Sequence, residues 1–167
     1  NYLVATMREV VERFGYVEYH ASVLEHAELY RAKGAENEEL AGEQTYTFVD
    51  RGGREVTLRP EMTPTVARMV AARRREFGFP LRLYSIPNVF RYERPQRGRL
   101  REHWQLNVDI FGSEARAADA EIIQVAHALL MALGTKESDF TIRLGSRNFL
   151  DAVITKLGLS EEDGKKL

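Results

Sequence analysis

Residues 90–105 read FRYERPQRGRLREHWQ, a run that combines arginines, carboxylates and flat rings around a short polar turn. Pro95 and Gly98 lie within it, between apolar ends, which predicts a hairpin loop and not a helix. The arginine guanidinium is always charged, and its planar fork of donors matches the oxygen atoms of a phosphate group. The sequence therefore predicts a phosphate clamp on a β-hairpin, of the kind that holds a nucleotide.

Arginine is concentrated in this part of the chain. Ten arginines and no lysine lie between Arg68 and Arg101, with Glu76 and Glu93 as the acids, although the whole chain has a formal net charge of -1. The segment indicates a site for a polyanion. The triplet at residues 73–75 is equally consistent with a solvated helix face, which is what most charge runs are.

Length and composition exclude several classes of protein. A chain of 167 residues fits one domain with a sizeable core. The lack of cysteine excludes a disulfide framework and a zinc-thiolate site, and His20, His26 and His127 do not have metal-ligand spacing. No apolar run is long enough to cross a bilayer and no secretion signal precedes the first helical pattern, so we expect a cytoplasmic protein without a protein-held metal.

Hydrophobic periodicity predicts an α+β fold, in which helices flank an antiparallel β-sheet. Residues 22–31 are expected to be loop and short helix, and residues 33–44 an exposed loop or weak helix. A further helix is expected to start with Thr63 as its cap and Pro64 as its first residue. The remaining expected elements are helices at 2–14, 117–133 and 147–157, and strands at 16–19, 46–50, 55–58, 81–86, 89–92, 104–111 and 140–144.

The strand expected at 104–111 has a polar face. Its period of two places Gln105, Asn107 and Asp109 together, opposite four apolar residues. An ordinary half-buried strand alternates in the same way. The neighbouring arginine hairpin favours a functional interpretation.

Two segments together resemble the histidyl-tRNA synthetases, which are class II aminoacyl-tRNA synthetases. They are residues 57–63, which read TLRPEMT, and residues 90–112, which look like the family's motif 2 and its continuation. The resemblance covers most of the chain. It implies a class II catalytic core with the motif 1 region at 1–25 and the motif 2 hairpin at 84–111. The family's motif 3, imidazole-recognising segments and anticodon-binding domain have no counterpart, so we expect residues 1–167 to be a truncated catalytic domain.

The resemblance implies that histidine and ATP form histidyl-adenylate, and that the histidine then passes to tRNA(His). By motif position, Arg91 would be the catalytic residue, in contact with the α-phosphate and the histidine carboxylate. Glu93 would bind the adenine amino group, Arg99 the γ-phosphate, and His103 the adenine ring, at a place where the family often has Phe. Mg²⁺ would arrive with ATP and bridge its phosphates.

Residues that would hold the substrate histidine, together with Arg91, are Glu61, Thr63, Gln105 and Asp109. They would bind chiefly its α-amino group. A cation in a partly dry pocket needs carboxylates, and Glu61 and Asp109 supply two. Glu61 is also explained as a carboxylate that a helix N-terminus favours.

Three classes of function remain open. The first is part of a histidyl-tRNA synthetase with weak or no activity of its own; the others are a histidine-sensing regulatory subunit of ATP phosphoribosyltransferase and an inactive folding piece. The complete phosphate clamp favours the first. Family members dimerise through motif 1, but Ala21 and Ser22 stand where the family usually has Thr and Pro, and residues 33–44 also depart from its pattern. The oligomeric state of this chain therefore stays open.

Overall fold

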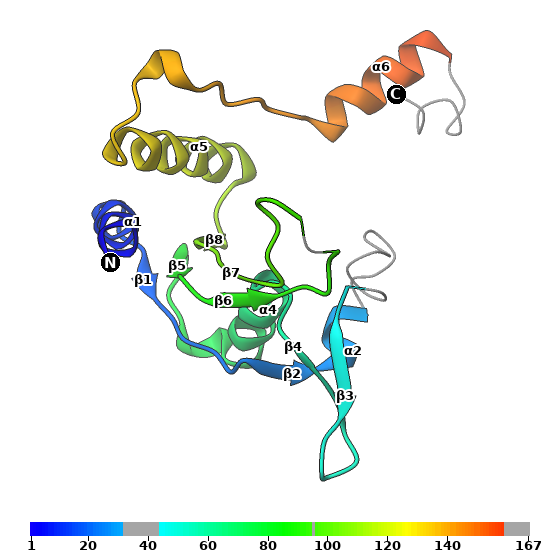
Figure 1. Ribbon diagram of the computed structural model, residues 1–167. Helices are drawn as coiled ribbons and strands as arrows, with labels where there is room; N and C mark the ends of the chain where they lie inside the picture. Colours follow the sequence, from blue (N-terminus) through cyan, green and yellow to red (C-terminus); the bar gives the residue numbers. More distant parts are fainter. Residues whose placement is uncertain (32–43, 95, 159–167) are drawn as a thin grey trace. The chain divides into compact units, whose positions relative to one another are not determined.

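The computed structural model describes residues 1–31, 44–94 and 96–158, and the expected loop at 33–44 lies almost wholly outside them. It divides the chain into two units, Asn1–Gly134 and Thr135–Leu167 (Figure 1). All elements of the predicted nucleotide-binding hairpin belong to the first unit.

One three-stranded sheet forms the centre of the first unit. Its strands are β1 (Val17–Glu18), β5 (Leu81–Ser85) and β8 (Asn107–Phe111), in the order β1-β5-β8. β8 pairs antiparallel with β5, whereas β1 pairs parallel with it. The fold is α+β as predicted, but this sheet is not wholly antiparallel.

A second sheet contains the predicted hairpin between residues 46 and 58. Its strands are β2 (Leu24–His26), β4 (Glu55–Leu58) and β3 (Tyr46–Val49), all antiparallel and in the order β2-β4-β3. The Asp50 carboxylate closes the turn by accepting hydrogen bonds from the backbone N–H groups of Gly52, at 2.8 Å, and Arg54, at 2.9 Å. β2 lies where the sequence predicted loop and helix, because three residues are too few to show a periodicity.

The helices of the first unit are α1 (Tyr2–Arg13), α2 (Ala27–Arg31), α4 (Thr63–Ala72) and α5 (Ala115–Ala132), with a short 3₁₀ helix, η1 (Arg74–Glu76). α5 lies alongside α1 (Figure 1). Pro64 occupies the first turn of α4 but as its second residue, one position later than predicted, because the helix begins at Thr63. The prediction that Thr63 caps this helix is wrong: Met62 is the N-cap residue, and Thr63 is already helical.

The third sheet is the hairpin of β6 (Asn88–Phe90) and β7 (Glu102–Trp104). The single strand expected at 104–111 is therefore two strands, because β7 pairs with β6 while β8 pairs with β5. Between them, the backbone N–H of Gln105 donates to the Pro87 carbonyl at 3.0 Å. The chain changes sheets at Gln105, which places this residue at the junction.

Two hydrophobic clusters cover the central sheet. The first packs α4 against it through Met62, Val66 and Val70. The second packs α1 and α5 against it through Val11 and Val125. The predicted apolar face of Leu106, Val108 and Ile110 packs on this second cluster, whereas Trp104 is 68% exposed.

The second unit contains a 3₁₀ helix, η2 (Glu137–Asp139), and α6 (Arg147–Leu157). The Ser146 hydroxyl caps α6 by accepting from the Phe149 N–H at 3.3 Å, and the helix ends at Gly158 in a left-handed conformation. The strand predicted at 140–144 is absent. The backbone is extended at Phe140 but joins no sheet, so the alternating apolar residues there are not evidence of a strand.

No helix in the described ranges combines the length and apolar character that spanning a membrane requires.

Candidate functional site: the arginine hairpin and the buried acceptors

The hairpin predicted from residues 90–105 is present. Val89 pairs with His103 and Phe90 with Glu102, and the backbone N–H of Arg91 extends the ladder by donating to the Arg101 carbonyl at 2.9 Å. At the tip, Gln96 and Arg99 form an isolated β-bridge, and Gly98 takes a φ of +83° that a residue with a side chain rarely adopts. The backbone therefore presents the arginines around a tight turn, as predicted.

A hollow of about 690 Å³ lies at the hairpin tip. Three arginines and one glutamate contribute to its walls, so it is positively charged overall. Glu93 and Arg99, both predicted to bind ATP, line it and face one another, with 3.4 Å between Arg99 Nη1 and Glu93 Oε2. The residues lining the hollow are Gln44, Tyr92, Glu93, Arg94, Gln96, Arg99 and Arg101.

Arg101 and Tyr92 brace this hollow, although the sequence predicted no role for either. The Arg101 guanidinium lies over the Tyr92 ring, 4.3 Å from its centroid, and its Nε donates to the Glu93 carbonyl at 3.1 Å. The Tyr92 ring also meets Tyr46 edge to face, with 5.3 Å between centroids. Tyr92 is thus held from two sides, and it fixes the backbone on which Glu93 lies. The only signal in the sequence is the ring and arginine content of the hairpin.

Arg91 is half-buried and lies outside the hollow's lining. Its Nε donates to the Pro60 carbonyl at 3.0 Å. This bond ties the hairpin to the β4–α4 junction, which carries Glu61 and Thr63. The structure thereby joins the two sequence segments that resemble the synthetase family.

A second group of predicted residues gathers at the central sheet. Asn107 Nδ2 donates to the Thr63 hydroxyl at 3.4 Å, which connects the start of α4 to β8. Gln105 Oε1 and Asp109 Oδ2 are both buried, and neither has a hydrogen-bond partner among the described residues. Buried polar atoms are nearly always paired, so two unpaired acceptors here indicate a ligand that donates hydrogen bonds.

Burial raises the pKa of the Asp109 carboxyl to about 6, while a hydrogen bond from Asn107 acts in the opposite direction. Desolvation disfavours the charged form because no cation offsets the lost hydration. A bound ammonium group would supply that cation. The electrostatics of Asp109 therefore match a site for an amine.

Two predicted residues have a less direct place. Glu61 is half-buried at the β4–α4 junction, and its backbone carbonyl accepts from the Tyr30 hydroxyl at 3.1 Å. His103 is half-buried in β7 and is not part of the hollow's lining. The described part of the chain contains no cluster of three or more His, Asp or Glu side chains arranged for a metal ion.

The chain is similar to proteins of one family. A family model described as histidyl-tRNA synthetase matches residues 1–167. The histidine--tRNA ligase of Leptospira biflexa is 51% identical over 151 residues, which are 90% of this chain and 34% of that protein. The histidine--tRNA ligase of Thermoplasma volcanium is 44% identical over 161 residues, or 96% of this chain and 37% of that protein. The chain thus spans about a third of the length of these curated relatives.

Solved structures agree with these sequence matches. A Bacillus halodurans protein, described as an ATP phosphoribosyltransferase regulatory subunit/histidyl-tRNA synthetase, has a TM-score of 0.81 at 28% identity, over 98% of this chain and 41% of that one. The histidyl-tRNA synthetase from Nostoc sp. PCC 7120 has a TM-score of 0.78 at 25% identity, over 98% and 37%. The fold is therefore that of the catalytic domains of these class II enzymes.

Proposed function

Because the chain belongs to the histidyl-tRNA synthetase family, we propose that it carries one wall of an ATP and histidine site. In the complete enzyme this site forms histidyl-adenylate and then charges tRNA(His), in the cytoplasm. The motif 1 region at 1–25 and the motif 2 hairpin at 84–111 supply this wall. On its own, the chain binds ATP and histidine weakly and activates histidine slowly or not at all.

The hollow at the hairpin tip receives ATP in this proposal. Glu93 accepts a hydrogen bond from the adenine amino group and Arg99 binds the γ-phosphate. His103, which lies in β7 outside the hollow's lining, stacks on the adenine ring. The ion pair between Glu93 and Arg99 spans 3.4 Å and the Arg99 side chain is largely exposed. The Glu93 side chain is only 18% exposed. Because Arg99 is well solvated, the pair contributes on the order of 1 kcal/mol, so ATP separates the two side chains at little cost.

The buried acceptors receive histidine. Gln105 Oε1 and Asp109 Oδ2 accept hydrogen bonds from its α-ammonium group, with Glu61 and Thr63 completing the set. An ammonium group in a partly dry pocket needs oxygen acceptors and negative charge. The unpaired state of both acceptor atoms is the observation that carries this proposal.

Arg91 acts between the two groups. A carboxylate oxygen of histidine attacks the α-phosphorus, the bond from that phosphorus to the bridging oxygen breaks, and pyrophosphate leaves with the electron pair. Because its Nε is held by the Pro60 carbonyl, Arg91 directs its two terminal nitrogens at the α-phosphate and the attacking carboxylate. Fixed donors of this kind stabilise the charge of the transition state. Mg²⁺ brought by ATP would supply charge neutralisation for the pyrophosphate that leaves.

Histidine-dependent exchange of labelled pyrophosphate into ATP tests this function. The expected result is slow exchange that requires histidine and is abolished in Arg91→Ala. Arg75→Ala removes an exposed arginine outside both groups and should leave the exchange unchanged. An exchange rate that Arg91→Ala does not alter would contradict the role of Arg91. If no exchange occurs and ATP does not bind at millimolar concentration, the chain has no active site of its own.

One finding favours a second candidate. The Bacillus halodurans structure is described as a regulatory subunit as well as a synthetase. The pyrophosphate exchange assay therefore also tests whether this chain is a histidine-binding regulator. A regulator would bind histidine without needing ATP and would catalyse no exchange. The Glu93–Arg99 hollow supports the synthetase, because a regulator has no use for a phosphate clamp.

A further inference from the structure

Arg59 is the most enclosed arginine near the proposed site. Its relative exposure is 6%, and within the described residues no carboxylate forms an ion pair with it. Burial lowers its pKa for that reason. A buried cation without an anionic partner is costly, so the presence of Arg59 at this place needs an explanation beyond packing.

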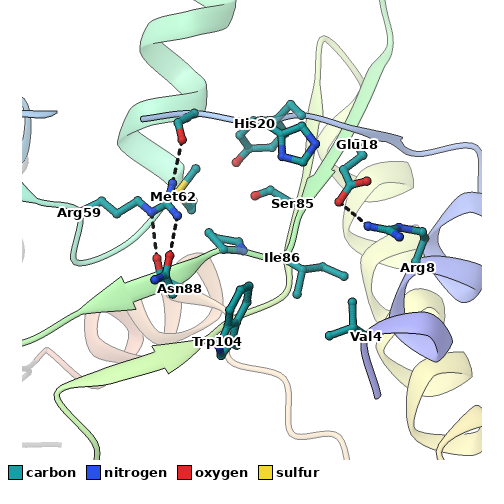
Figure 2. A pocket seen from close by; sticks show the side chains of 13 residues that line it. Val4, Arg8, Glu18, His20, Arg59, Met62, Ser85, Ile86, Asn88 and Trp104 are labelled. Atoms are coloured by element: carbon teal, nitrogen blue, oxygen red, sulfur yellow. Dashed lines mark hydrogen bonds and ion pairs between the residues drawn. The ribbon is translucent and has the colours of Figure 1, made fainter. Parts of the chain in front are cut away.

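The guanidinium of Arg59 donates instead to amide oxygens on two separate segments (Figure 2). Its Nε donates to the backbone carbonyl of Asn88, and its Nη2 to the Asn88 side-chain oxygen, both at 2.9 Å. Its Nη1 donates to the carbonyls of Ala21 at 3.0 Å and Ser22 at 3.4 Å. One side chain thus binds the first residue of β6 to the segment between β1 and β2.

The backbone of the same residue joins the same segments. The Arg59 N–H donates to the Val23 carbonyl at 3.0 Å, and the Arg59 carbonyl accepts from the Phe90 N–H at 2.9 Å. The next residue, Pro60, accepts from Arg91 Nε at 3.0 Å. Residues 59 and 60 therefore hold β6 and the residue after it at Asn88, Phe90 and Arg91 in turn.

We infer that Arg59 is a positioning residue, which fixes the hairpin strand so that the Arg91 guanidinium stays oriented by the Pro60 carbonyl. This inference rests on the proposed function of Arg91, but its geometric part does not need activity. A planar fork that binds three carbonyl oxygens and a side-chain amide cannot be replaced by lysine, whose ammonium group is a point charge. Arg59→Lys keeps the charge and loses the brace.

The test compares Arg59→Lys with Arg82→Lys. Arg82 makes a bidentate ion pair with Glu121, at 2.7 Å for both bonds, away from the hairpin. Both variants should lower the stability to urea. The ¹H–¹⁵N signal of Arg91 Nε, identified by its loss in Arg91→Lys, should shift and exchange faster with water in Arg59→Lys but not in Arg82→Lys.

Pyrophosphate exchange gives the functional readout. Misplacing a catalytic group slows mainly the chemical step. We therefore expect kcat to fall by about 10-fold or more in Arg59→Lys, with a smaller change in the KM for ATP. An unchanged Arg91 signal would overturn the inference and leave Arg59 as a structural residue. An unchanged kcat beside a shifted signal would overturn it equally.

Two further outcomes also bear on the inference. If the unaltered chain shows no exchange and does not bind ATP at millimolar concentration, the proposed function fails, whereas the Arg91 signal still tests the brace. If Arg59→Lys does not fold, Asn88→Ala removes one acceptor of the guanidinium together with the hydrogen bond from Asn88 Nδ2 to Glu102 Oε1, at 2.8 Å. Glu102→Ala removes only the second bond, so the Arg91 signal should shift in Asn88→Ala and not in Glu102→Ala.

Discussion

Four buried side-chain oxygens in the described part of the chain lack hydrogen-bond partners, and all lie in or next to the β1-β5-β8 sheet. They belong to Tyr19, Ser85, Gln105 and Asp109. Leaving such a group unpaired costs about 1–3 kcal/mol, and proteins rarely tolerate several together. Their concentration beside the start of α4 indicates a sheet built to receive a polar ligand.

In the absence of ligand, Tyr19→Phe is expected to stabilise the chain. The substitution removes a buried hydroxyl that interacts with Ser85 but forms no hydrogen bond of normal geometry, so the free energy of unfolding should rise by about 1 kcal/mol. Tyr16→Phe is the matched control, because the Tyr16 hydroxyl donates to Glu121 Oε1 at 2.9 Å. This control should lose about 1 kcal/mol. Urea denaturation of both variants measures the contrast, and a loss of stability in Tyr19→Phe would contradict it.

The Asp109 carboxyl should make stability depend on pH. It binds a proton more tightly in the folded chain, where its pKa is about 6, than at its ordinary value of 3.8. Its contribution to the free energy of unfolding is therefore present at low pH and is lost as the pH rises from about 4 to about 6. After allowance for solvent screening, the loss is roughly 2 kcal/mol.

Asp109→Asn isolates this contribution from the other titrating groups. The variant should match the unaltered chain at pH 4 and exceed its free energy of unfolding by roughly 2 kcal/mol at pH 7. Urea denaturation across this range gives the difference at each pH. A difference that stays constant from pH 4 to pH 7 would show that burial does not shift this carboxyl.

The end of β8 is closed by a contact that allows no side chain. Gly112 has a φ of +70°, and a Cβ there would lie 2.7 Å from Phe79 Cδ1. Gly112→Ala should therefore lose more than the roughly 1 kcal/mol of backbone strain alone, by a further 1–3 kcal/mol or so of overpacking. Gly53→Ala is the control, because Gly53 has a φ of +76° with nothing within 4 Å of a Cβ. Equal losses of urea stability in the two variants would contradict the predicted overpacking against Phe79.

The elements that sequence predicted well are those with a local signal. The β3–β4 hairpin follows from alternation around two glycines, and α1 and α5 follow from long helical periodicity. The division between β7 and β8 could not be predicted, since alternation continues through residue 105 while the pairing partner changes from β6 to β5. Strand pairing is a tertiary property, which also explains the missed β2 and the absent strand at 140–144.

The candidate site likewise contains residues that the sequence pointed to and one residue, Arg59, that it did not. Residue types and motif order pointed to Glu93 and Arg99 at the hairpin and to Gln105 and Asp109 at the sheet. The structure places Glu93 and Arg99 within 3.4 Å of each other and leaves Gln105 Oε1 and Asp109 Oδ2 buried and unpaired. Their roles toward ATP and histidine stay predictions. Arg59 could not be recognised from sequence, because its importance lies in which carbonyl oxygens surround its guanidinium.

The first unit contains both hydrophobic clusters and every residue of the proposed site. Its clusters draw on α1, α4, α5 and the central sheet. The proposed residues, from Glu61 to Asp109, all precede the boundary at Gly134. A separate core and an internal site are the conditions under which a unit folds and binds by itself.

Residues 1–134 alone should therefore unfold in one cooperative transition and bind ATP with the dissociation constant of the whole chain. Because no proposed contact to ATP comes from Thr135–Leu167, removing that unit takes away no part of the phosphate clamp. Calorimetric titration of both chains with ATP, beside urea denaturation, measures the two properties. Arg99→Ala should weaken ATP binding by the same factor in residues 1–134 as in the whole chain. A shorter chain that folds but binds ATP more weakly would show that the second unit completes the site.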